Sequence, residues 1–307
     1  MIVYSAADVA RLLPYGDLIE ALRKGFAEGA ETPVRHHHET AATTTLLLMP
    51  SWNTKFTGLK TVTVKSDNAA LGFPTIQASY LLIDNASGTP VAVMDGTELT
   101  RRRTAAASAL ASGYLSRPGS SKLLLVGAGA LAMHFAHAHA AIRPIAQIQI
   151  FNRNPEKAVE LARELAAQGL QAEAVTDIEA ACREADIISC MTTSVTAIVK
   201  GEWLKAGTHV DLTGAFRPSM RETDSPVVAR ARVFVDTREG ALAEAGDLIQ
   251  AKNDGVFDFD DLQGDLFDLA RDKVHGRQTD AEITLFKSCG TGLEDLAAAQ
   301  FAYLRQG

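Results

Sequence analysis

Positive charge is in short supply in this chain. Its 307 residues include 30 lysines and arginines against 37 aspartates and glutamates, which gives a formal net charge of −7. Proteins that bind nucleic acids or anionic membrane surfaces usually present an excess of basic side chains. The composition therefore gives no support for either kind of partner, and we expect neither.

Long apolar runs and paired cysteines are also missing. No stretch approaches the roughly 20 apolar residues that span a bilayer, and Asp8 and Arg11 interrupt the start where a secretory signal would need an apolar core. The three cysteines, Cys182, Cys190 and Cys289, are scattered without a CxxC pair. Such cysteines are typical of core side chains in a reducing compartment, so we expect a cytoplasmic protein.

Regular spacing of metal ligands is absent as well. The histidines at 36–38 are followed by Glu39, but consecutive residues of a strand point to opposite faces of its sheet. These side chains therefore do not converge on one ion, and we predict no metal site.

The first part of the chain contains strand-like runs framed by helices. Residues 17–30 carry apolar side chains at helical spacing, and the alanine-rich stretch 97–115 predicts a second helix. Residues 85–88 (NASG) have the composition of a hairpin turn. The predicted strands of this part are 43–50, 58–64, 75–84 and 89–96.

A break at residues 116–121 (SRPGSS) separates this part from a different pattern. Beyond it, short apolar runs alternate with helical stretches such as 155–168, which predicts an α/β domain with a Rossmann-type doubly wound parallel sheet. Its predicted strands are 122–126, 148–151, 172–175, 186–190, 209–213 and 233–236. From about 276, one more strand and a helix are expected to return to the first domain, which would be α+β and discontinuous. We therefore predict one domain over 1–116 plus about 277–307, and a dinucleotide-binding domain over 117–276.

The clearest motif is the glycine turn at 127–132 (GAGALA), between a predicted strand and a predicted helix. Gly127 permits the tight turn, Gly129 lets the backbone approach a pyrophosphate, and Ala132 keeps the helix close to the sheet. The helix start, with Ala130 and Leu131, offers unpaired N–H groups to the anion. This context predicts a bound dinucleotide.

The end of the second strand indicates which dinucleotide. An NAD site usually has Asp or Glu there to bind the ribose hydroxyls, whereas this chain has Asn152 followed by Arg153. A guanidinium binds a 2′-phosphate that a carboxylate would repel, so we predict NADPH, with NADH also possible. The competing interpretation of Arg153 is a solvated charge. Residues that follow later strands should line the same crevice: Thr192, Thr193, Ser194, Thr213 and Gly214.

Basic residues of the first part are candidates for holding a substrate. They are Arg35, Lys60 and Arg103. In a regular strand Lys60 shares its face with Val62 and Val64, and a lone lysine on an apolar face suggests a function. Taken singly, a residue of this kind is more often a solvated surface charge. The sequence alone does not decide which member of the triplet 101–103 points inward.

Several segments together resemble one known family. They are PVRHHHE (33–39), GLKTVTV (58–64), FPTIQASYLLIDNASGTPVAVMDG (73–96), LTRRRTAAASALASGYL (99–115), VGAGALA (126–132), FNRNPEKA (151–158), LTGAFRPSMRETD (212–224) and ITLFKSCGTGLEDLAAA (283–299). Over nearly its whole length the chain resembles the ornithine cyclodeaminase/mu-crystallin family, which includes related alanine dehydrogenases and cyclic ketimine reductases.

The resemblance implies roles that the residue pattern alone does not. It implies a homodimer formed through the first domain and an active site between the domains. Arg35 and Arg103 match positions that hold the substrate carboxylate, and Lys60 matches the active-site lysine. Thr75 matches a position near the nicotinamide, and Ser288 one near the cofactor. By this resemblance Arg103 is the inward member of its triplet.

One departure from the family pattern guides the choice of reaction. Cyclodeaminases of this family have an aspartate just before the Cys-Pro pair of a loop after the fifth strand, and alignment on Pro218 places Phe216 there. Phenylalanine takes no proton. We therefore predict reduction of a cyclic ketimino acid, Δ1-pyrroline-2-carboxylate or its six-membered homologue Δ1-piperideine-2-carboxylate, to L-proline or L-pipecolate. The alternatives are ornithine cyclodeaminase, an alanine-type dehydrogenase, or a non-catalytic protein that binds a small ligand with NADPH.

Overall fold

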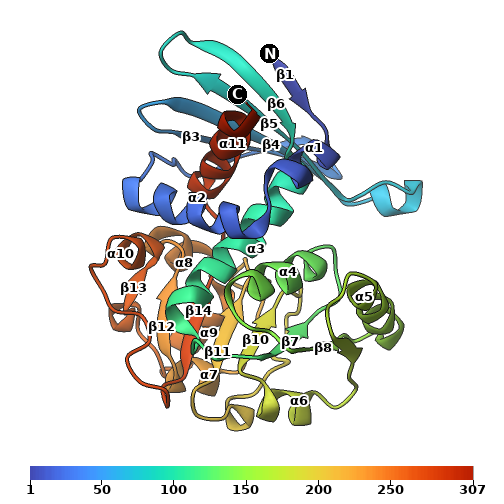
Figure 1. Cartoon of the computed structure of the whole chain (residues 1–307), viewed down its shortest axis with the longest axis vertical. Helices are drawn as coiled ribbons and strands as arrows, with labels where there is room; N and C mark the ends of the chain where they lie inside the picture. Colours follow the sequence, from blue (N-terminus) through green and yellow to red (C-terminus); the bar gives the residue numbers. More distant parts are fainter. Residues whose placement is uncertain (307) are drawn as a thin grey trace. The chain divides into compact units, whose positions relative to one another are not determined.

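The protein is described by a computed structural model that covers residues 1–306, the side chain of residue 69 excepted. It forms two units (Figure 1): the first comprises Met1–Thr104 and the stretch from Thr291 onward, and the second Ala105–Gly290. Helix α3 (Gly96–Leu115) contributes residues to both. The predicted domain boundaries at 116 and about 277 stay a prediction.

A mixed sheet forms the centre of the first unit. Its six strands lie in the order β1-β6-β5-β4-β3-β2; β1 is parallel to β6, and the other neighbours are antiparallel. Helix α11 packs against β3, β4, β5 and α2. The strands and helices are β1 (Ile2–Tyr4), β2 (His36–Ala41), β3 (Thr44–Trp52), β4 (Phe56–Lys65), β5 (Ile76–Asp84), β6 (Thr89–Asp95), α1 (Ala6–Leu12), α2 (Tyr15–Glu28), the short η1 (Asn68–Leu71) and α11 (Gly292–Gln306).

Alternation along β4 explains how this sheet positions a charged residue. Lys60 and Val62 are buried on one face, while Leu59 and Thr61 are half-buried on the other. The period of two is that of a strand with one covered face. The strand that carries Lys60 therefore directs its side chain into the interior of the unit.

The second unit contains a sheet in which every pairing is parallel. Its strand order is β13-β12-β14-β11-β10-β7-β8-β9. The strands are β7 (Lys122–Val126), β8 (Gln147–Phe151), β9 (Ala172–Ala174), β10 (Ile187–Cys190), β11 (His209–Leu212), β12 (Arg232–Val235), β13 (Gly264–Asp265) and β14 (Thr284–Lys287). The predicted Rossmann-type sheet and second α+β domain are confirmed.

Helices flank this sheet, as the alternating pattern predicted. They are α4 (Ala132–Ile142), α5 (Pro155–Ala167), α6 (Ile178–Glu184), α7 (Ser225–Arg230), α8 (Arg238–Glu244), α9 (Gly246–Asn253) and α10 (Leu266–Ala270), with the short η2 (Gly201–Trp203) and η3 (Phe259–Asp261). Fully buried side chains of the central strands, Leu124, Ile188, Val210 and Leu285, lie in one core cluster.

The last strand differs in place from the expectation. β14 lies between β11 and β12 in the second unit, so only α11 of the C-terminal stretch belongs to the first. An apolar run predicts a buried strand, but its periodicity does not tell which sheet it joins. The short elements β1 and α1 were not expected, because three to seven residues give too weak a pattern.

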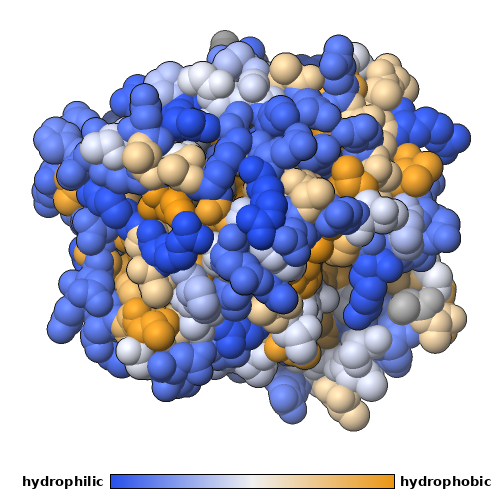
Figure 2. Space-filling model, turned by 90° about the horizontal axis from the view of Figure 1, so that it is seen from below, coloured by the Kyte–Doolittle hydropathy of each residue, from blue (hydrophilic) through white to orange (hydrophobic). Residues whose placement is uncertain are grey.

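The surface completes the description of the fold. Among the helices of residues 1–306, none is long and apolar enough to cross a membrane. On the face of the molecule drawn in Figure 2, hydrophilic side chains predominate and apolar ones lie in small, separate groups.

Candidate functional site

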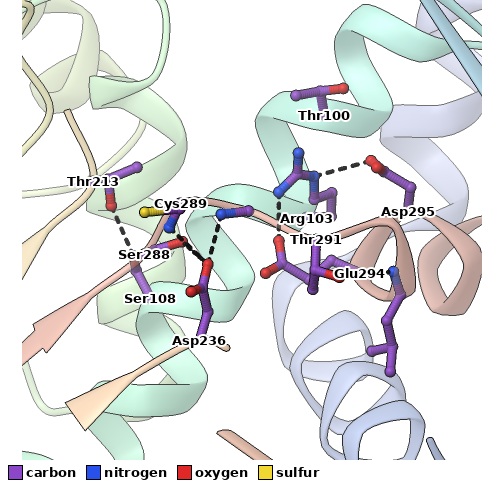
Figure 3. Close-up of polar contacts among 12 residues, drawn as sticks. Thr100, Arg103, Ser108, Thr213, Asp236, Ser288, Cys289, Thr291, Glu294 and Asp295 are labelled. Carbon is purple, nitrogen blue, oxygen red and sulfur yellow. Dashed lines mark hydrogen bonds and ion pairs between the residues drawn. The ribbon is translucent and has the colours of Figure 1, made fainter. Parts of the chain in front are cut away.

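A buried cluster of charges lies in the first unit. Lys60 Nζ donates to Asp295 Oδ2 at 2.7 Å, and Arg103 Nε donates to Asp295 Oδ1 at 2.9 Å. Arg103 Nη1 also donates to Glu294 Oε2. Figure 3 shows Arg103 between the two acidic side chains. The four residues are at most 5% exposed, so α11 brings two carboxylates to two buried cations of β4 and α3.

Burial and charge together set the pKa of Lys60. Burial disfavours its charged form, the carboxylate of Asp295 favours it, and the nearby cations Arg103 and Arg35 disfavour it again. The net effect lowers the pKa of Lys60 to about 8. A lysine of this kind exchanges a proton near neutral pH. For Arg103, burial is outweighed by the two carboxylates, which raise its pKa.

The structure brings Arg35 and Arg103 near Lys60 and leaves Thr75 apart from them. Arg35 is half-buried, and its charge acts on Lys60. Arg103 is the buried member of its triplet, whereas Arg102 pairs with Glu98 at 2.6 Å. Thr75 is exposed just before β5, while Lys60 pairs with Tyr80 five residues further along that strand, roughly 16 Å away. The first unit alone does not bring Thr75 to the cluster.

The glycine turn of the second unit has the geometry that a dinucleotide needs. Gly127 has φ +114°, which disfavours other residues, and its N–H donates to the Phe151 carbonyl at 2.8 Å. A Cβ added at Gly129 would meet no atom within 4 Å. Packing within the protein therefore does not explain why this position is a glycine. The open space beside it, before the start of α4, fits a pyrophosphate.

Asn152 and Arg153 follow β8 beside this turn. Asn152 Oδ1 accepts from the Ala128 N–H at 3.2 Å, and its Nδ2 donates to the Asn154 carbonyl at 2.8 Å. The amide thus supports the glycine turn, a role that the sequence did not suggest. Arg153 is exposed and forms no ion pair within residues 1–306. Its guanidinium is available to an anion.

The loops after β10 and β11 lie against each other at the carboxyl edge of the sheet. Glu222, a fully buried residue, accepts from the Thr192 N–H at 2.5 Å and from the Gly214 N–H at 2.7 Å. β7 and β10 are neighbours although they are not consecutive, and ligands of open α/β sheets bind at such a change of strand order. Gly127 and Thr192 flank this point, because a Cβ at Gly127 would lie 3.2 Å from Thr192 Cγ2.

The remaining predicted cofactor residues lie at the same edge. Thr193 is exposed, and Thr213 is buried with its hydroxyl 3.2 Å from that of Ser108. Ser288 Oγ donates to Asp236 Oδ2 at 3.0 Å, and Asp236 also accepts from two backbone N–H groups of the following turn. Figure 3 shows both groups of contacts. The second unit therefore gathers the predicted cofactor residues at the carboxyl ends of parallel strands.

Several buried acidic residues were missed as site residues. Glu294 and Asp295 open α11 beside apolar residues, and Glu222 stands in a loop. An acidic pair inside an otherwise apolar helix was the available signal, since charged side chains are rarely buried unless paired. For metals, the described residues 1–306 contain no group of His, Cys, Asp and Glu side chains arranged to hold an ion.

Comparisons with known proteins agree with this geometry. A Delta(1)-pyrroline-2-carboxylate reductase of Paracoccus denitrificans is 37% identical over 97% of this chain and 94% of its own. The same enzyme of Thermococcus litoralis, solved with NADH and L-proline, has a TM-score of 0.93 and 33% identity, covering 99% of this chain and 97% of its own. An archaeal alanine dehydrogenase dimer with bound NAD has a TM-score of 0.92 and 28% identity, covering 99% and 95%.

A family profile covers the described chain. The profile of the ornithine cyclodeaminase/mu-crystallin family matches residues 1–306. Together with the relatives above, the match confirms the predicted family. The chain belongs to the ornithine cyclodeaminase/mu-crystallin family.

Proposed function

We propose that this protein uses NADPH to reduce the C=N bond of a cyclic ketimino acid, Δ1-pyrroline-2-carboxylate or Δ1-piperideine-2-carboxylate, to L-proline or L-pipecolate. The observation that carries the proposal is the buried pair Lys60 and Arg103, whose Nζ and Nε atoms lie 2.7 and 2.9 Å from the two carboxylate oxygens of Asp295. It combines a group that can donate a proton with a guanidinium that can hold a carboxylate. The predicted enzyme class, an oxidoreductase acting on C=N bonds, is confirmed by the relatives.

Orientation of the substrate is assigned to the two arginines. A guanidinium binds a carboxylate with paired N–H donors in a fixed plane. Arg103 donates through Nε to Asp295 and through Nη1 to Glu294, and these two hydrogen bonds fix the plane of its guanidinium group. The direction of its remaining N–H donors is thereby fixed as well. Together with Arg35, Arg103 would fix the carboxylate and with it the imine carbon, chiefly an effect of proximity.

Proton supply is assigned to Lys60. A protonated imine is much more electrophilic than a neutral one, so reduction needs a proton at the ring nitrogen. With its pKa lowered to about 8, Lys60 is charged near neutral pH yet releases a proton more readily than an exposed lysine. The bound cofactor supplies the hydride, and the ring nitrogen keeps the proton as part of the product amine.

The preference for NADPH is assigned to Arg153. This exposed side chain follows β8, where an NAD site usually has a carboxylate for the ribose. Asn152 brings no negative charge that would repel a 2′-phosphate, and its amide is occupied by the glycine turn. NADH lacks that phosphate, so we expect it to bind more weakly.

The test is direct. Purified protein is mixed with NADPH and each cyclic imine, and absorbance at 340 nm is followed, with L-ornithine plus NAD assayed in parallel for ammonia. NADPH oxidation with formation of the cyclic amino acid would support the proposal. Ammonia and proline from ornithine without use of NADPH would refute it in favour of cyclodeamination, a reaction for which the exposed Phe216 offers no proton acceptor.

We also propose that two copies associate through the first unit. Neighbouring strands align an apolar row on the sheet face opposite Lys60: Pro50, Leu59, Leu81, Val93 and Val3. Four of these side chains are half-buried, and Val3 is 72% exposed. A second copy would cover this row.

Light scattering at several protein concentrations tests the dimer. A Leu81→Lys variant places a charge in the middle of the row and should give a monomeric mass. The matched substitution Leu304→Lys, at an exposed position near the end of α11, should not change the mass. A wild-type monomer at micromolar concentration would refute this assignment.

A further inference from the structure

Hydrogen bonds fix the backbone of Glu222 on both sides of its peptide unit. Its N–H donates to Asp247 Oδ1 at 2.7 Å, and its carbonyl accepts from the N–H groups of Ile198 and Val199 at 2.8 and 3.1 Å. The next N–H, of Thr223, also donates to Asp247. Both backbone groups of Glu222 are therefore engaged, so the position of its carboxylate is determined by the loop that carries it.

That carboxylate joins two loops that come from different strands. Oε1 accepts from Thr192, the second residue after β10, and Oε2 accepts from Gly214, the second residue after β11. A Cβ at Gly214 would collide with the Thr192 carbonyl and with Glu222 itself. The two loops are thus in direct contact, and both oxygens of one side chain hold them together.

Charged groups surround Glu222 on the elements packed against it. Asp247 of α9 is a second buried carboxylate, and Lys287 of β14 is the buried cation, with Nζ 4.0 Å from Asp247 Oδ2. The buried thiol of Cys190 in β10 also lies near, and its pKa is raised well above the usual range by burial and by these carboxylates. Two carboxylates therefore share one ammonium group inside the unit.

From this geometry we propose that Glu222 is a positioning residue for the cofactor: as a carboxylate it fastens the loops after β10 and β11 to each other, and the edge that they form binds the dinucleotide. The inference rests on the proposed function for the identity of the ligand. It assigns to Glu222 no contact with substrate or cofactor.

Protonation of Glu222 should loosen this edge. A carboxylate accepts from two N–H groups, whereas a carboxylic acid has a hydroxyl that faces one of those donors. Burial and Asp247 raise the pKa of Glu222, and Lys287 and the Thr192 donors oppose them, with a net value of about 7. Binding of the dinucleotide should therefore weaken as the pH falls from 8 to 6.

Fluorescence titration of the protein with NADPH, from pH 6 to 8.5, tests the inference without using turnover. We expect the dissociation constant of the wild type to rise up to about tenfold between pH 8 and pH 6, because each pH unit below the pKa changes the ionised fraction at most tenfold. Glu222→Gln should bind about tenfold more weakly at pH 8, as expected for loss of a charged hydrogen bond. The dissociation constant of Glu222→Gln should also lack the change with pH that titration of Glu222 causes in the wild type.

Two variants serve as controls. Glu164→Gln makes the same change on an exposed side chain of α5 and should match the wild type. Asp247→Asn keeps a carbonyl oxygen for the Glu222 and Thr223 N–H groups but removes the neighbouring charge, so the midpoint of the pH dependence should move to lower pH. The phosphate of NADPH titrates in the same range, but it does so equally for every variant.

The outcomes separate this inference from the proposed reaction. Wild-type affinity in Glu222→Gln, or an unchanged midpoint in Asp247→Asn, would overturn the role of Glu222. If Glu222→Gln does not fold, the Asp247→Asn titration decides. Binding of NADPH without imine reduction would refute only the reaction, whereas a wild type that binds no dinucleotide would overturn both.

Discussion

Substitution of Asp295 by asparagine is the sharpest test of the charge cluster in the first unit. Asp295 is the acceptor for both Lys60 and Arg103, and it is fully buried. An asparagine side chain at this position would have one carbonyl oxygen for two donors, and its NH2 group would face the other cation. The variant keeps the shape of the side chain and removes one of the two carboxylates.

The size of the effect follows from the electrostatics of Lys60. Two unit charges 4 Å apart interact by about 4 kcal/mol at an effective dielectric constant of 20, and an opposite charge at this range shifts a pKa by about 1 to 3. The pKa of Lys60 should therefore fall from about 8 toward about 6. At pH 7.5 the protonated fraction would drop from about 75% to about 3%, some 25-fold.

The assay is NADPH oxidation with Δ1-pyrroline-2-carboxylate from pH 5.5 to 9.5. If Lys60 supplies the proton, kcat/KM of the wild type declines above about pH 8, and in Asp295→Asn the decline begins near pH 6, with a loss of about 25-fold at pH 7.5. Titration of the imine itself is common to both proteins. The matched control is Asp17→Asn, an exposed aspartate of the same unit.

Unfolding in urea separates loss of function from loss of structure. Removing one partner of a buried ion pair costs about 3 to 5 kcal/mol, so the rates are compared only under conditions in which the variant is folded. A high-pH decline that stays near pH 8, with kcat/KM within about twofold of the wild type, would refute the role assigned to Lys60 and Asp295.

Three further predictions concern the second unit. Arg153→Ser should weaken binding of NADPH about tenfold and leave binding of NADH unchanged, as measured by fluorescence titration; equal effects would refute its role. Gly214→Ala should lower the unfolding free energy by about 2 to 4 kcal/mol, since its Cβ meets the Thr192 backbone, and urea curves like those of the wild type would contradict this. Asp186 accepts from Arg117, from Lys205 and from the N–H groups of Ser121 and Lys122. The two N–H groups and Lys205 outweigh burial and lower the pKa of Asp186. Its contribution to stability is therefore present above pH 4 and lost as the pH falls below it, so Asp186→Asn should destabilise at pH 7 by about 1 to 2 kcal/mol and little at pH 2; an equal loss at both pH values would refute it.

The second unit was predictable because its strands are short, apolar and separated by helices. Residues 122–126 were expected as a strand, and β7 is Lys122–Val126. The central strands β7, β10, β11 and β14 are buried on both faces, so their residues form largely apolar runs that are easy to recognise. The glycine turn is likewise a local feature, because strand, turn and helix are consecutive in the sequence.

The charge clusters were not predictable in the same way. Lys60 could be assigned to an apolar face by alternation, but its partner Asp295 is 235 residues away. Glu222 has its carboxylate between residues from two loops that only the sheet order brings together. Such pairings depend on tertiary structure, and no local pattern of a single sequence contains them.

The position of β14 and α11 has a consequence for how the chain folds as it is synthesised. β14 lies inside the second unit's sheet between β11 and β12, and α11 supplies the carboxylates for Lys60 and Arg103. Until the ribosome has made residue 287, that sheet has a gap in its middle, and until residue 295 the first unit holds two cations without their acceptors. Domains usually fold in order from the N-terminus. Here neither the sheet of the second unit nor the charge cluster of the first can be completed before the last tenth of the chain is made.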